Sequence, residues 1–497
     1  MQKERAPLYE RLVETARKRR ARFHVPGHKG RGGLDWDSGS REHFQAIMDI
    51  DMTEIPGLDD LYHPEGAIRE AQQLAADCFG AEETFFLVGG STAGNIAMIL
   101  AACEPGELIL MQRNVHKSAI HACMLAGCQV VFLNPRWDSE SKLASVVSAD
   151  TVREALQRYP QTRAVFLTNP NYYGMGSDLR TIADVVHAYG IPLLIDEAHG
   201  AHYGFHPGVP ASALSCGADA AVQSTHKMLT ALTMGAMLHV QGDQLNRDIL
   251  RQRLAMLQSS SPSYPIMASL DLSRRWMHTQ GTAGIDRALG NISRFHELCH
   301  ERHIPIVTLQ PAPTAAYETL DPFKLSVRAQ AGAGVSGFEL LERLEQCECV
   351  PEMADPLHVV LALSPMTSEE ELLRLVDALE DIAQSGALTG TPAQEHKEGS
   401  PINWLAREQT AGISPMPITI RMPSSRHVAA QERVTLKEAI GRPAAEMIVP
   451  YPPGIPIVYP GETITVSTAE HIHRLAQAGA RFQGAADPTM RTVLIQL

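Results

Sequence analysis

The chain has 497 residues and a formal net charge of −13, with 44% hydrophobic and 20% charged residues. This length and composition are typical of a globular protein of two or three domains, and the negative charge argues against general nucleic-acid binding. The longest apolar run, Ile96–Cys103, is far shorter than the roughly 20 residues that a membrane-spanning helix needs, so we expect no membrane segment.

The N-terminus and the cysteines predict a cytoplasmic protein. Residues 1–22 are charged throughout and predict a polar helix, because they lack the apolar core and cleavage site of a secretory signal. The eight cysteines are scattered without a C-x-x-C spacing, so we expect them to be reduced.

Short apolar runs alternate with helix-length spacers between residues 84 and 240. This pattern predicts an α/β fold in which helices cover both faces of a seven-stranded, mostly parallel sheet. Ligands of such sheets bind at the carboxyl ends of the strands. The predicted strands are Thr84–Val88, Leu108–Met111, Val130–Leu133, Ala164–Thr168, Leu193–Ile195, Ala220–Gln223 and Gly235–Val240.

A glycine-rich turn, residues 89–95, follows the first strand and leads into an apolar helix. Its amides and the hydroxyls of Ser91 and Thr92 would favour a phosphate at the helix N-terminus, although an ordinary capped helix start has the same pattern. Because both the dinucleotide fingerprint and the P-loop are absent, we expect a cofactor with one phosphate. His116, after the second strand, could stack on a flat ring or be an ordinary loop histidine.

Two further strand ends carry the strongest chemical signal. One apolar strand runs into Asp196-Glu197-Ala198-His199, and a later strand runs into Ser224-Thr225-His226-Lys227. Some cofactors bind covalently to a lysine amine and also need a nearby anion. Two strand ends at one edge of a sheet would supply both groups to such a cofactor. Taken singly, Lys227 could be a surface residue and Asp196 a helix cap.

Beyond residue 275 the pattern changes to longer amphipathic helices mixed with strands, followed by a polar stretch rich in glycine and proline. We therefore predict a smaller α+β domain, a linker and a further C-terminal domain. The predicted division is an N-terminal helix over 1–22, a large domain over 23–275, a small domain over 276–384, a linker over 385–401 and a C-terminal domain over 402–497.

Seven motifs in this order resemble the bacterial Orn/Lys/Arg decarboxylases, which are pyridoxal-phosphate enzymes of the aspartate-aminotransferase fold. The similarity covers nearly the whole chain. Long relatives carry an N-terminal wing domain that organises large rings, whereas the first motif here begins at Phe23, so the resemblance predicts the short form. The motifs are Phe23–Gly30, Gly57–Tyr62, Arg113–Ser118, Asp196–His202, Ser224–Lys227, Ser259–Pro265 and Tyr451–Pro456.

The resemblance implies a role for each residue of the site. Lys227 would hold the cofactor as a Schiff base, Asp196 would pair with its pyridine nitrogen, and His116 would stack on its ring. Long relatives have a threonine where this chain has Gly90, so one phosphate contact is lost or replaced by Thr92. Ser259 or Ser260 would reach the phosphate from a neighbouring subunit, which predicts at least a homodimer. The other implied cofactor-binding residues are Ser91, Ser224, His226 and Ala198, with Gly90 and Thr92 at the turn.

The implied reaction is decarboxylation of a basic L-amino acid (arginine, lysine or ornithine) to CO2 and an amine of polyamine metabolism. A pyridine ring kept protonated by a buried carboxylate can accept the electron pair left at Cα. The proton that returns to Cα could come from Lys227, His199 or His226. We favour arginine or lysine as substrate, and Asp59, Asp60 and Glu462 are candidates for binding its distal cation.

Two other functions share these motifs. An aminotransferase or β-eliminating lyase of the same fold would use the same lysine and aspartate, with Arg328 as a candidate carboxylate clamp. A regulatory protein could retain the fold, but intact Lys227, Asp196 and His116 argue against it. A metal cluster of Glu197 with His199, His202 and His206 is a further alternative, but the cofactor interpretation already uses His199, so we predict no metal.

Overall fold

The computed structural model describes residues 2–18, 20–31, 36–311, 316–330, 335–386, 388, 412–414, 416–420, 431–451, 454–477 and 479–497. In these ranges no helix combines the length and apolar character that crossing a bilayer requires. Most of the predicted linker, residues 387 and 389–401, lies outside the described residues, and the predicted domain boundaries stay predictions. All eight cysteines are free thiols.

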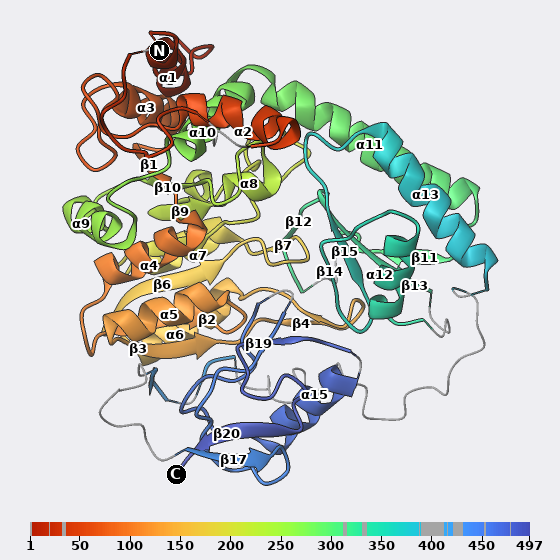
Figure 1. The fold of residues 1–497 in the computed structure, drawn as a ribbon. Coiled ribbons are helices and arrows are strands. Elements are labelled where there is room, and N and C mark those ends of the chain that lie inside the picture. Colours follow the sequence, from red (N-terminus) through yellow and green to blue (C-terminus); the bar gives the residue numbers. More distant parts are fainter. Residues whose placement is uncertain are drawn as a thin grey trace.

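The large unit is built on a sheet with the strand order β1-β10-β9-β8-β6-β2-β3-β16 (Figure 1). Neighbours from β9 to β3 run parallel, whereas β10 is antiparallel to both β1 and β9. All seven predicted strands are present, and the prediction of a mostly parallel sheet is confirmed. The strands are β1 (Glu83–Leu87), β2 (Leu108–Gln112), β3 (Gln129–Leu133), β6 (Thr162–Thr168), β8 (Leu193–Asp196), β9 (Ala220–Gln223), β10 (Ala236–Val240) and β16 (Ile418–Thr419).

The eighth strand, β16, was not predicted from the sequence. It has two residues and pairs antiparallel with the edge strand β3, where Ile418 lies opposite Val130. A pair of residues is too short to carry a periodic signal, because recognising a strand needs a run of about four or more.

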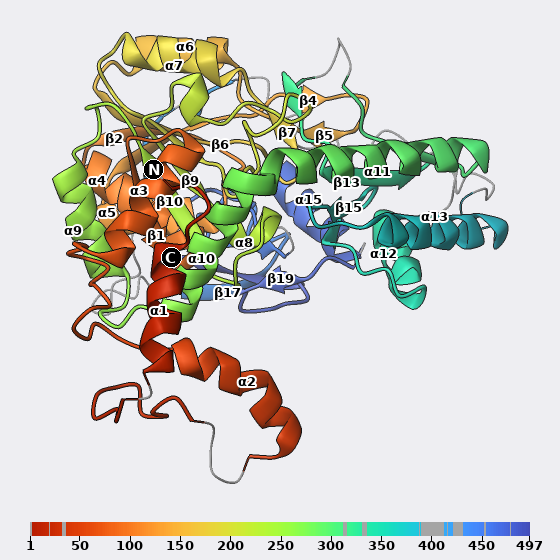
Figure 2. The same ribbon diagram turned by 90° about the horizontal axis from the view of Figure 1, so that it is seen from above.

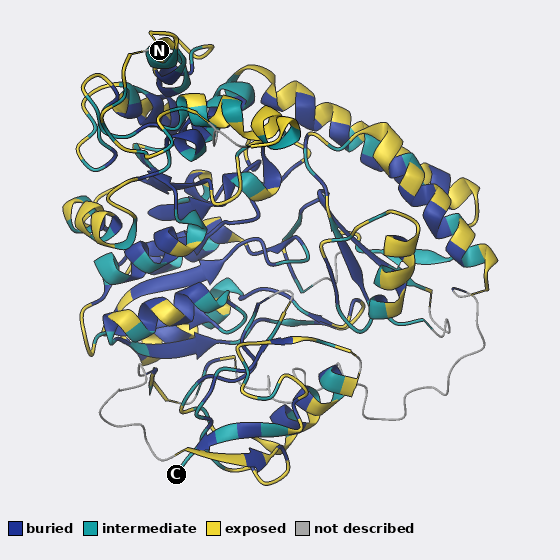
Figure 3. Ribbon diagram, viewed as in Figure 1, coloured by how far each residue is buried: buried dark blue, intermediate teal, exposed yellow. Residues whose placement is uncertain are grey.

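The strands consist mainly of apolar residues because helices cover both faces of the sheet. Ile109 and Met111 of β2 point to the face covered by α4 (Gly90–Ala102), α5 (Lys117–Ala126) and α9 (Arg247–Leu257). Leu108 and Leu110, the alternate residues, point to the face covered by α6 (Ala149–Arg158) and α7 (Leu179–His187). Four of the strands, β2, β8, β9 and β10, are accordingly buried at every residue (Figure 3).

Helix α4 lies unusually close to the sheet because one of its residues is glycine. A Cβ at Gly94 would stand 2.5 Å from Cγ2 of Val222 and 2.8 Å from Cδ1 of Leu87. This close approach fixes the start of α4, and with it the glycine-rich turn, against the ends of β1 and β9.

The small unit is a four-stranded antiparallel sheet with the order β11-β13-β15-β14, packed against three helices (Figure 1). Two of the helices begin with a capping box, at Ser336 with Glu339 and at Ser368 with Glu371. The elements are α11 (Thr282–Glu301), β11 (Ile306–Thr308), β13 (Lys324–Ala329), α12 (Gly337–Gln346), β14 (Met353–Ala354), β15 (Val359–Ala362) and α13 (Glu369–Gln384).

The C-terminal unit is fastened to the large unit by Arg113. Its guanidinium forms an ion pair of 3.0 Å with Glu462, donates to the carbonyl of Ile457 at 2.7 Å, and lies 4.2 Å from the ring centroid of Tyr459. The unit contains β17 (Gln431–Thr435), β18 (Val449–Pro450), α15 (Val466–Gln477), β19 (Phe482–Gln483) and β20 (Thr492–Gln496).

The N-terminal segment is held by a buried ion pair on α10 (Tyr264–Trp276). Arg274 and Asp271, both fully buried, lie 2.6 Å apart; Asp271 accepts from the amide of Leu8, and Arg274 donates to the carbonyl of Lys3. This pair packs α1 (Pro7–Arg17) and α3 (Ala67–Phe79) against the large unit. By contrast, α2 (Ser38–Ile50) extends away from the body and has no buried residue (Figure 2).

The remaining elements are short connections. They are β4 (Trp137–Asp138), β5 (Leu143–Ala144), β7 (Met175–Gly176), η1 (Leu214–Cys216), α8 (Thr225–Met228), the π-helical turn η2 (Met277–Gly281) and β12 (Thr319–Leu320).

We predict that Gly94→Ala lowers the free energy of unfolding by about 1–3 kcal/mol, because the added methyl group overpacks the contact between α4 and the sheet. Chemical denaturation measures this change. The control is Gly290→Ala on α11, where a Cβ would meet nothing within 4 Å; it should stabilise by about 0.5–1 kcal/mol through helix propensity. Equal effects at both positions would contradict the close approach of α4.

Candidate active site

Lys227 lies in α8, directly after β9. The residue is exposed, yet its Nζ lies 3.1 Å from Nε2 of the buried His199. The surrounding protein desolvates the amine and lowers the pKa of Lys227, while the charges of Asp196 and Glu352 oppose this shift. Lys227 therefore has the environment of a reactive amine rather than that of a solvated surface lysine.

Asp196 ends β8, the strand next to β9, and is only 3% exposed. One carboxylate oxygen accepts from Nδ2 of Asn95 at 2.8 Å, and the other accepts from the amide of Ala198 at 3.1 Å. Burial raises the pKa of Asp196, while Lys227, Asn95 and Ala198 act in the opposite direction. Within the described part of the chain, no cation forms an ion pair with this carboxylate.

His116 is joined to Asp196 by a chain of hydrogen bonds. Nδ2 of Asn95 also donates to the hydroxyl of Ser118 at 3.1 Å, and that hydroxyl lies 2.8 Å from Nδ1 of His116. The amide of Ser118 donates to the same Nδ1, so this nitrogen is an acceptor and the proton is on Nε2. Burial lowers the pKa of His116 to about 4, so its ring is neutral at neutral pH.

The glycine-rich turn forms the first turn of α4, which begins at Gly90. By helical geometry, the first amides of α4 have no acceptor within the helix. Ser224, at the end of β9, donates to the hydroxyl of Ser91 at 2.7 Å, so two of the predicted phosphate ligands are together. Thr92 is exposed at the same turn, and His226 is half-buried beside Lys227.

Ser259 and Ser260 lie on the exposed loop between α9 and α10, outside this group. The carbonyl of Ser259 accepts from the hydroxyl of Tyr62, and the preceding Gln258 accepts from the amide of Val88 at 2.8 Å. The loop is therefore attached to the end of β1, while its two serine residues face outward.

His199 is the centre of a buried cluster that includes a residue of the small unit. Its Nδ1 lies 2.7 Å from Nζ of Lys324, the first residue of β13, and its ring centroid lies 4.9 Å from that of Tyr172. Burial lowers the pKa of His199 well below its usual range, and the charges of Lys227 and Lys324 lower it further. His199 is therefore a neutral imidazole between two amines.

Glu352, directly before β14, supplies negative charge that acts on this cluster. The residue is exposed, and its carboxylate raises the pKa of both Lys227 and Lys324 against the effect of burial. It acts in the same direction on His226.

The acidic residues predicted to meet a distal cation are engaged elsewhere. Asp59 accepts from the amides of Gly66 and Ile68 at the start of α3, and Asp60 accepts from the amide of Tyr62. Glu462 is the ion-pair partner of Arg113. Arg328 lies on the same face of β13 as Lys324, but four residues, or roughly 13 Å, further along the strand.

The histidines after β8 have separate partners. His202 lies 3.1 Å from Asp321, with both side chains fully buried, and His206 lies 3.5 Å from Asp286 on α11. Throughout the described ranges, no three ligand-type side chains are close enough together to hold a metal ion.

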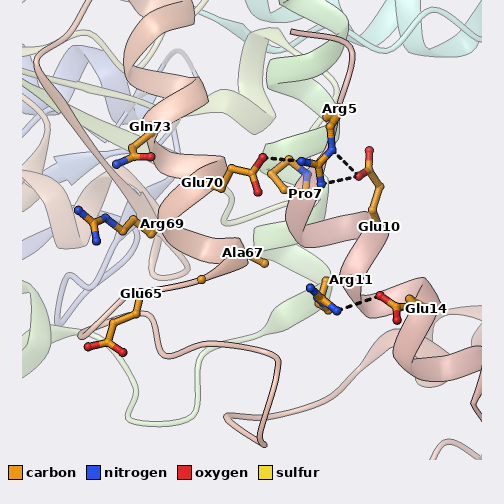
Figure 4. A pocket seen from close by; sticks show the side chains of 11 residues that line it. Arg5, Pro7, Glu10, Arg11, Glu14, Glu65, Ala67, Arg69, Glu70 and Gln73 are labelled. Carbon is orange, nitrogen blue, oxygen red and sulfur yellow. Dashed lines mark hydrogen bonds and ion pairs between the residues drawn. The ribbon is translucent and has the colours of Figure 1, made fainter. Parts of the chain in front are cut away.

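A polar cavity of about 530 Å³ lies between α1 and the start of α3 (Figure 4). Most of its charged side chains are paired, since Arg5 pairs with Glu10 and Glu70, and Arg11 pairs with Glu14. None of the predicted site residues lines it, so this cavity is separate from the cluster around Lys227.

The residues around Lys227 fit a phosphorylated aromatic aldehyde. Lys227 is an exposed residue, the carboxylate of Asp196 is buried and forms no ion pair with any described residue, and the serine pair lies at a helix N-terminus. A buried carboxylate is costly unless it is paired, so a protonated ring nitrogen would satisfy Asp196. Such an arrangement can bind an amine covalently and withdraw electrons from it.

Sequence reasoning missed four residues of the site, namely Asn95, Ser118, Lys324 and Glu352. Asn95 and Ser118 stand inside motifs that were recognised, so a search for buried amide and hydroxyl groups within those motifs would have found them. Lys324 and Glu352 have no comparable local signal.

Comparisons with known proteins identify the family of the chain. The family model described as "Orn/Lys/Arg decarboxylase, major domain" matches residues 6–311, and the model described as the C-terminal domain of that family matches residues 420–487. The predicted resemblance is thereby confirmed.

Three individual matches extend over nearly the whole chain. The chain is 40% identical over 484 residues to the uncharacterised protein YaaO of Bacillus subtilis, covering 96% of each chain. It is 33% identical over 499 residues to an arginine decarboxylase of Bacillus subtilis, covering 100% of this chain and 98% of the other. The lysine decarboxylase LdcF of Francisella novicida superimposes with a TM-score of 0.82 over 99% of this chain and 80% of that chain, at 21% identity, which confirms the fold.

Proposed function

Because the chain belongs to the Orn/Lys/Arg decarboxylase family, we propose that it uses pyridoxal phosphate to convert L-arginine to CO2 and the corresponding amine. The chain is a decarboxylase of a basic amino acid. An aminotransferase or another lyase of this fold is not favoured.

One observation carries the assignment of the site. Lys227 follows β9, and its charge acts on Asp196 at the end of the neighbouring strand β8, a buried carboxylate that forms no ion pair in the described chain. Pyridoxal phosphate supplies an aldehyde that binds amines and a protonated ring that accepts the electron pair left at Cα when CO2 departs. Lys227 would bind this aldehyde, and Asp196 would hold the ring nitrogen in its protonated form.

The other residues position the cofactor. His116, fixed by Ser118 and neutral, would present an uncharged ring for stacking. Ala198 and Asn95 orient the carboxylate of Asp196. The phosphate would be held by the turn that contains Gly90, Ser91 and Thr92, together with Ser224 and His226.

We predict that Lys227→Ala abolishes the visible absorbance of bound pyridoxal phosphate. The same substitution should slow the release of CO2 from arginine by roughly a thousandfold or more. The amine product and CO2 are measured together, so that a keto-acid product would be detected. Lys18→Ala, on the exposed face of α1, is the matched control and should behave as the unaltered protein. Full turnover in Lys227→Ala would refute the proposed chemistry.

We propose that Glu352 binds the distal guanidinium of arginine. It is the exposed carboxylate whose charge acts on Lys227, Lys324 and His226, so it lies within electrostatic reach of the reacting amine. A carboxylate matches a guanidinium with two parallel hydrogen bonds. The 33% identity to an arginine decarboxylase supports arginine over lysine or ornithine.

We predict that Glu352→Gln raises the KM for arginine by about tenfold to a hundredfold while changing kcat less, because a charge-assisted hydrogen bond to the distal group is lost in the ground state and the transition state alike. Steady-state kinetics with arginine, lysine and ornithine measure this. Glu342→Gln, on the exposed face of α12, is the control. An unchanged KM for all three amino acids would show that Glu352 does not bind the substrate.

We further propose that the protein is a homodimer in which Ser259 or Ser260 approaches the phosphate site of the partner. The projecting helix α2 supports this proposal. None of its residues is buried in the single chain, and it presents Phe44 at 52% and Ile47 at 43% exposure. An apolar surface of this kind is typical of a protein interface.

We predict that Phe44→Glu weakens the dimer by about 2–3 kcal/mol, raising its dissociation constant roughly a hundredfold, because a charge is placed where apolar surface is buried. Sedimentation over a dilution series measures the change. The control is Leu497→Glu, an exposed apolar residue at the chain end remote from α2 (Figure 1). Identical dimerisation of both variants would exclude α2 from the interface.

A further inference from the structure

Three nitrogen-bearing side chains form one continuous line across the boundary between the large and small units. Nζ of Lys324, on β13, lies 2.7 Å from Nδ1 of His199, and Nε2 of the same ring lies 3.1 Å from Nζ of Lys227. Lys324 is only 3% exposed and His199 only 5%, so water competes little for these contacts.

Counting protons limits the possible states of this line. A neutral imidazole has one N–H donor and one acceptor nitrogen, and a protonated amine can only donate. If both lysines were protonated, one of the two contacts would place a donor against a donor. Both contacts are therefore hydrogen bonds only when one of the two amines is unprotonated and accepts from the ring.

The distances and charges indicate which amine keeps its proton. The 2.7 Å contact of Lys324 is in the range of charge-assisted hydrogen bonds, whereas the 3.1 Å contact of Lys227 is that of a neutral pair. Burial lowers the pKa of Lys324 to about 8, against the raising effect of Asp321 and Glu352, so most of this amine is protonated at neutral pH.

We propose that Lys324 is a positioning residue that acts through His199: it donates to Nδ1 and holds the ring in the tautomer whose Nε2–H donates to Lys227, which keeps the amine of Lys227 unprotonated. This inference rests on the proposed function, because an unprotonated amine is the form that reacts with an aldehyde. The groups that face the line are Asp196, Glu352, His116 and Tyr172, with His226 beside Lys227 and Asp321 beside Lys324.

The same line can return a proton to Lys227. Transfer of the Nε2 proton to Lys227, coupled to transfer of a Lys324 proton to Nδ1, moves two protons by one step each. The net result is that one positive charge passes from Lys324 to Lys227, and His199 is left neutral in its other tautomer. No charge then resides on the buried imidazole, whose burial disfavours protonation.

The first test reads the tautomer directly in the protein without cofactor, by nitrogen NMR of isotopically labelled histidine, with His199→Gln to assign the signal. We expect the Nε2–H tautomer of a neutral ring, and in Lys324→Met a loss of the preference for it. A wild-type ring protonated on Nδ1 overturns the proposal, and this measurement does not depend on catalysis.

The second test follows the rate at which the cofactor-free protein captures added pyridoxal phosphate, as a function of pH. Removing the charge and the donor of Lys324 should raise the pKa of Lys227, so the profile of Lys324→Met should shift to higher pH by about one unit or more, with capture roughly tenfold slower below the midpoint. Lys324→Arg keeps a charged donor, so its pH profile should remain nearer that of the wild type. The control Lys18→Met should have the same pH profile as the wild type.

The outcomes separate this inference from the proposed function. If the unaltered protein captures no pyridoxal phosphate at any pH, the proposed function fails whatever the tautomer. If capture is normal but Lys324→Met leaves its pH midpoint in place, Lys324 has only a structural role and the inference is overturned.

Discussion

The arrangement of the site depends on one buried carboxylate. Asp196 is 3% exposed, and among the described residues its two oxygens accept only from an amide side chain and a backbone amide. An ionised carboxylate in such surroundings costs several kcal/mol unless a positive group compensates it. The charge of Lys227 acts on this carboxylate, His116 is neutral and Asn95 holds one carboxylate oxygen, which together suit a protonated ring nitrogen as the ion-pair partner of Asp196.

The parts of the site that follow from local pattern could be predicted from the sequence. Asp196 and Lys227 each come directly after an apolar run, and parallel neighbouring strands such as β8 and β9 bring their carboxyl ends to one edge of the sheet. The turn before α4 was recognisable for the same reason, because glycine, serine and threonine at a helix start are a local signal. Asn95 and Ser118 lie inside motifs that were recognised. Which of several polar residues in a motif faces inward depends on helix packing, so their roles could not be assigned from the motif alone.

The parts that depend on how distant units dock could not be predicted. Lys324 is simply the first residue of an ordinary strand, and Glu352 precedes another, so neither shows locally that it lies beside Lys227. A residue was also wrongly proposed for substrate binding, because its actual contacts are not visible in the sequence. Asp59 seemed available for a substrate cation, but its carboxylate accepts several amides around the start of α3, and capping of this kind is invisible in a list of acidic residues. The two-residue strand β16 was missed because it exists only through its pairing with β3.

Lys324 and Glu352 belong to one rigid piece of structure, since β13 and β14 both pair with β15. Any displacement of this small sheet relative to the large unit would move both side chains together. The contact of Lys324 with His199 governs which ring nitrogen of His199 carries the proton next to Lys227. The charge of Glu352 acts on the amine of Lys227 as well. Docking of the small unit therefore places two groups at once: Glu352, whose charge would attract a cationic substrate side chain, and Lys324, which controls the protonation of Lys227. A loosely docked small unit would weaken both effects.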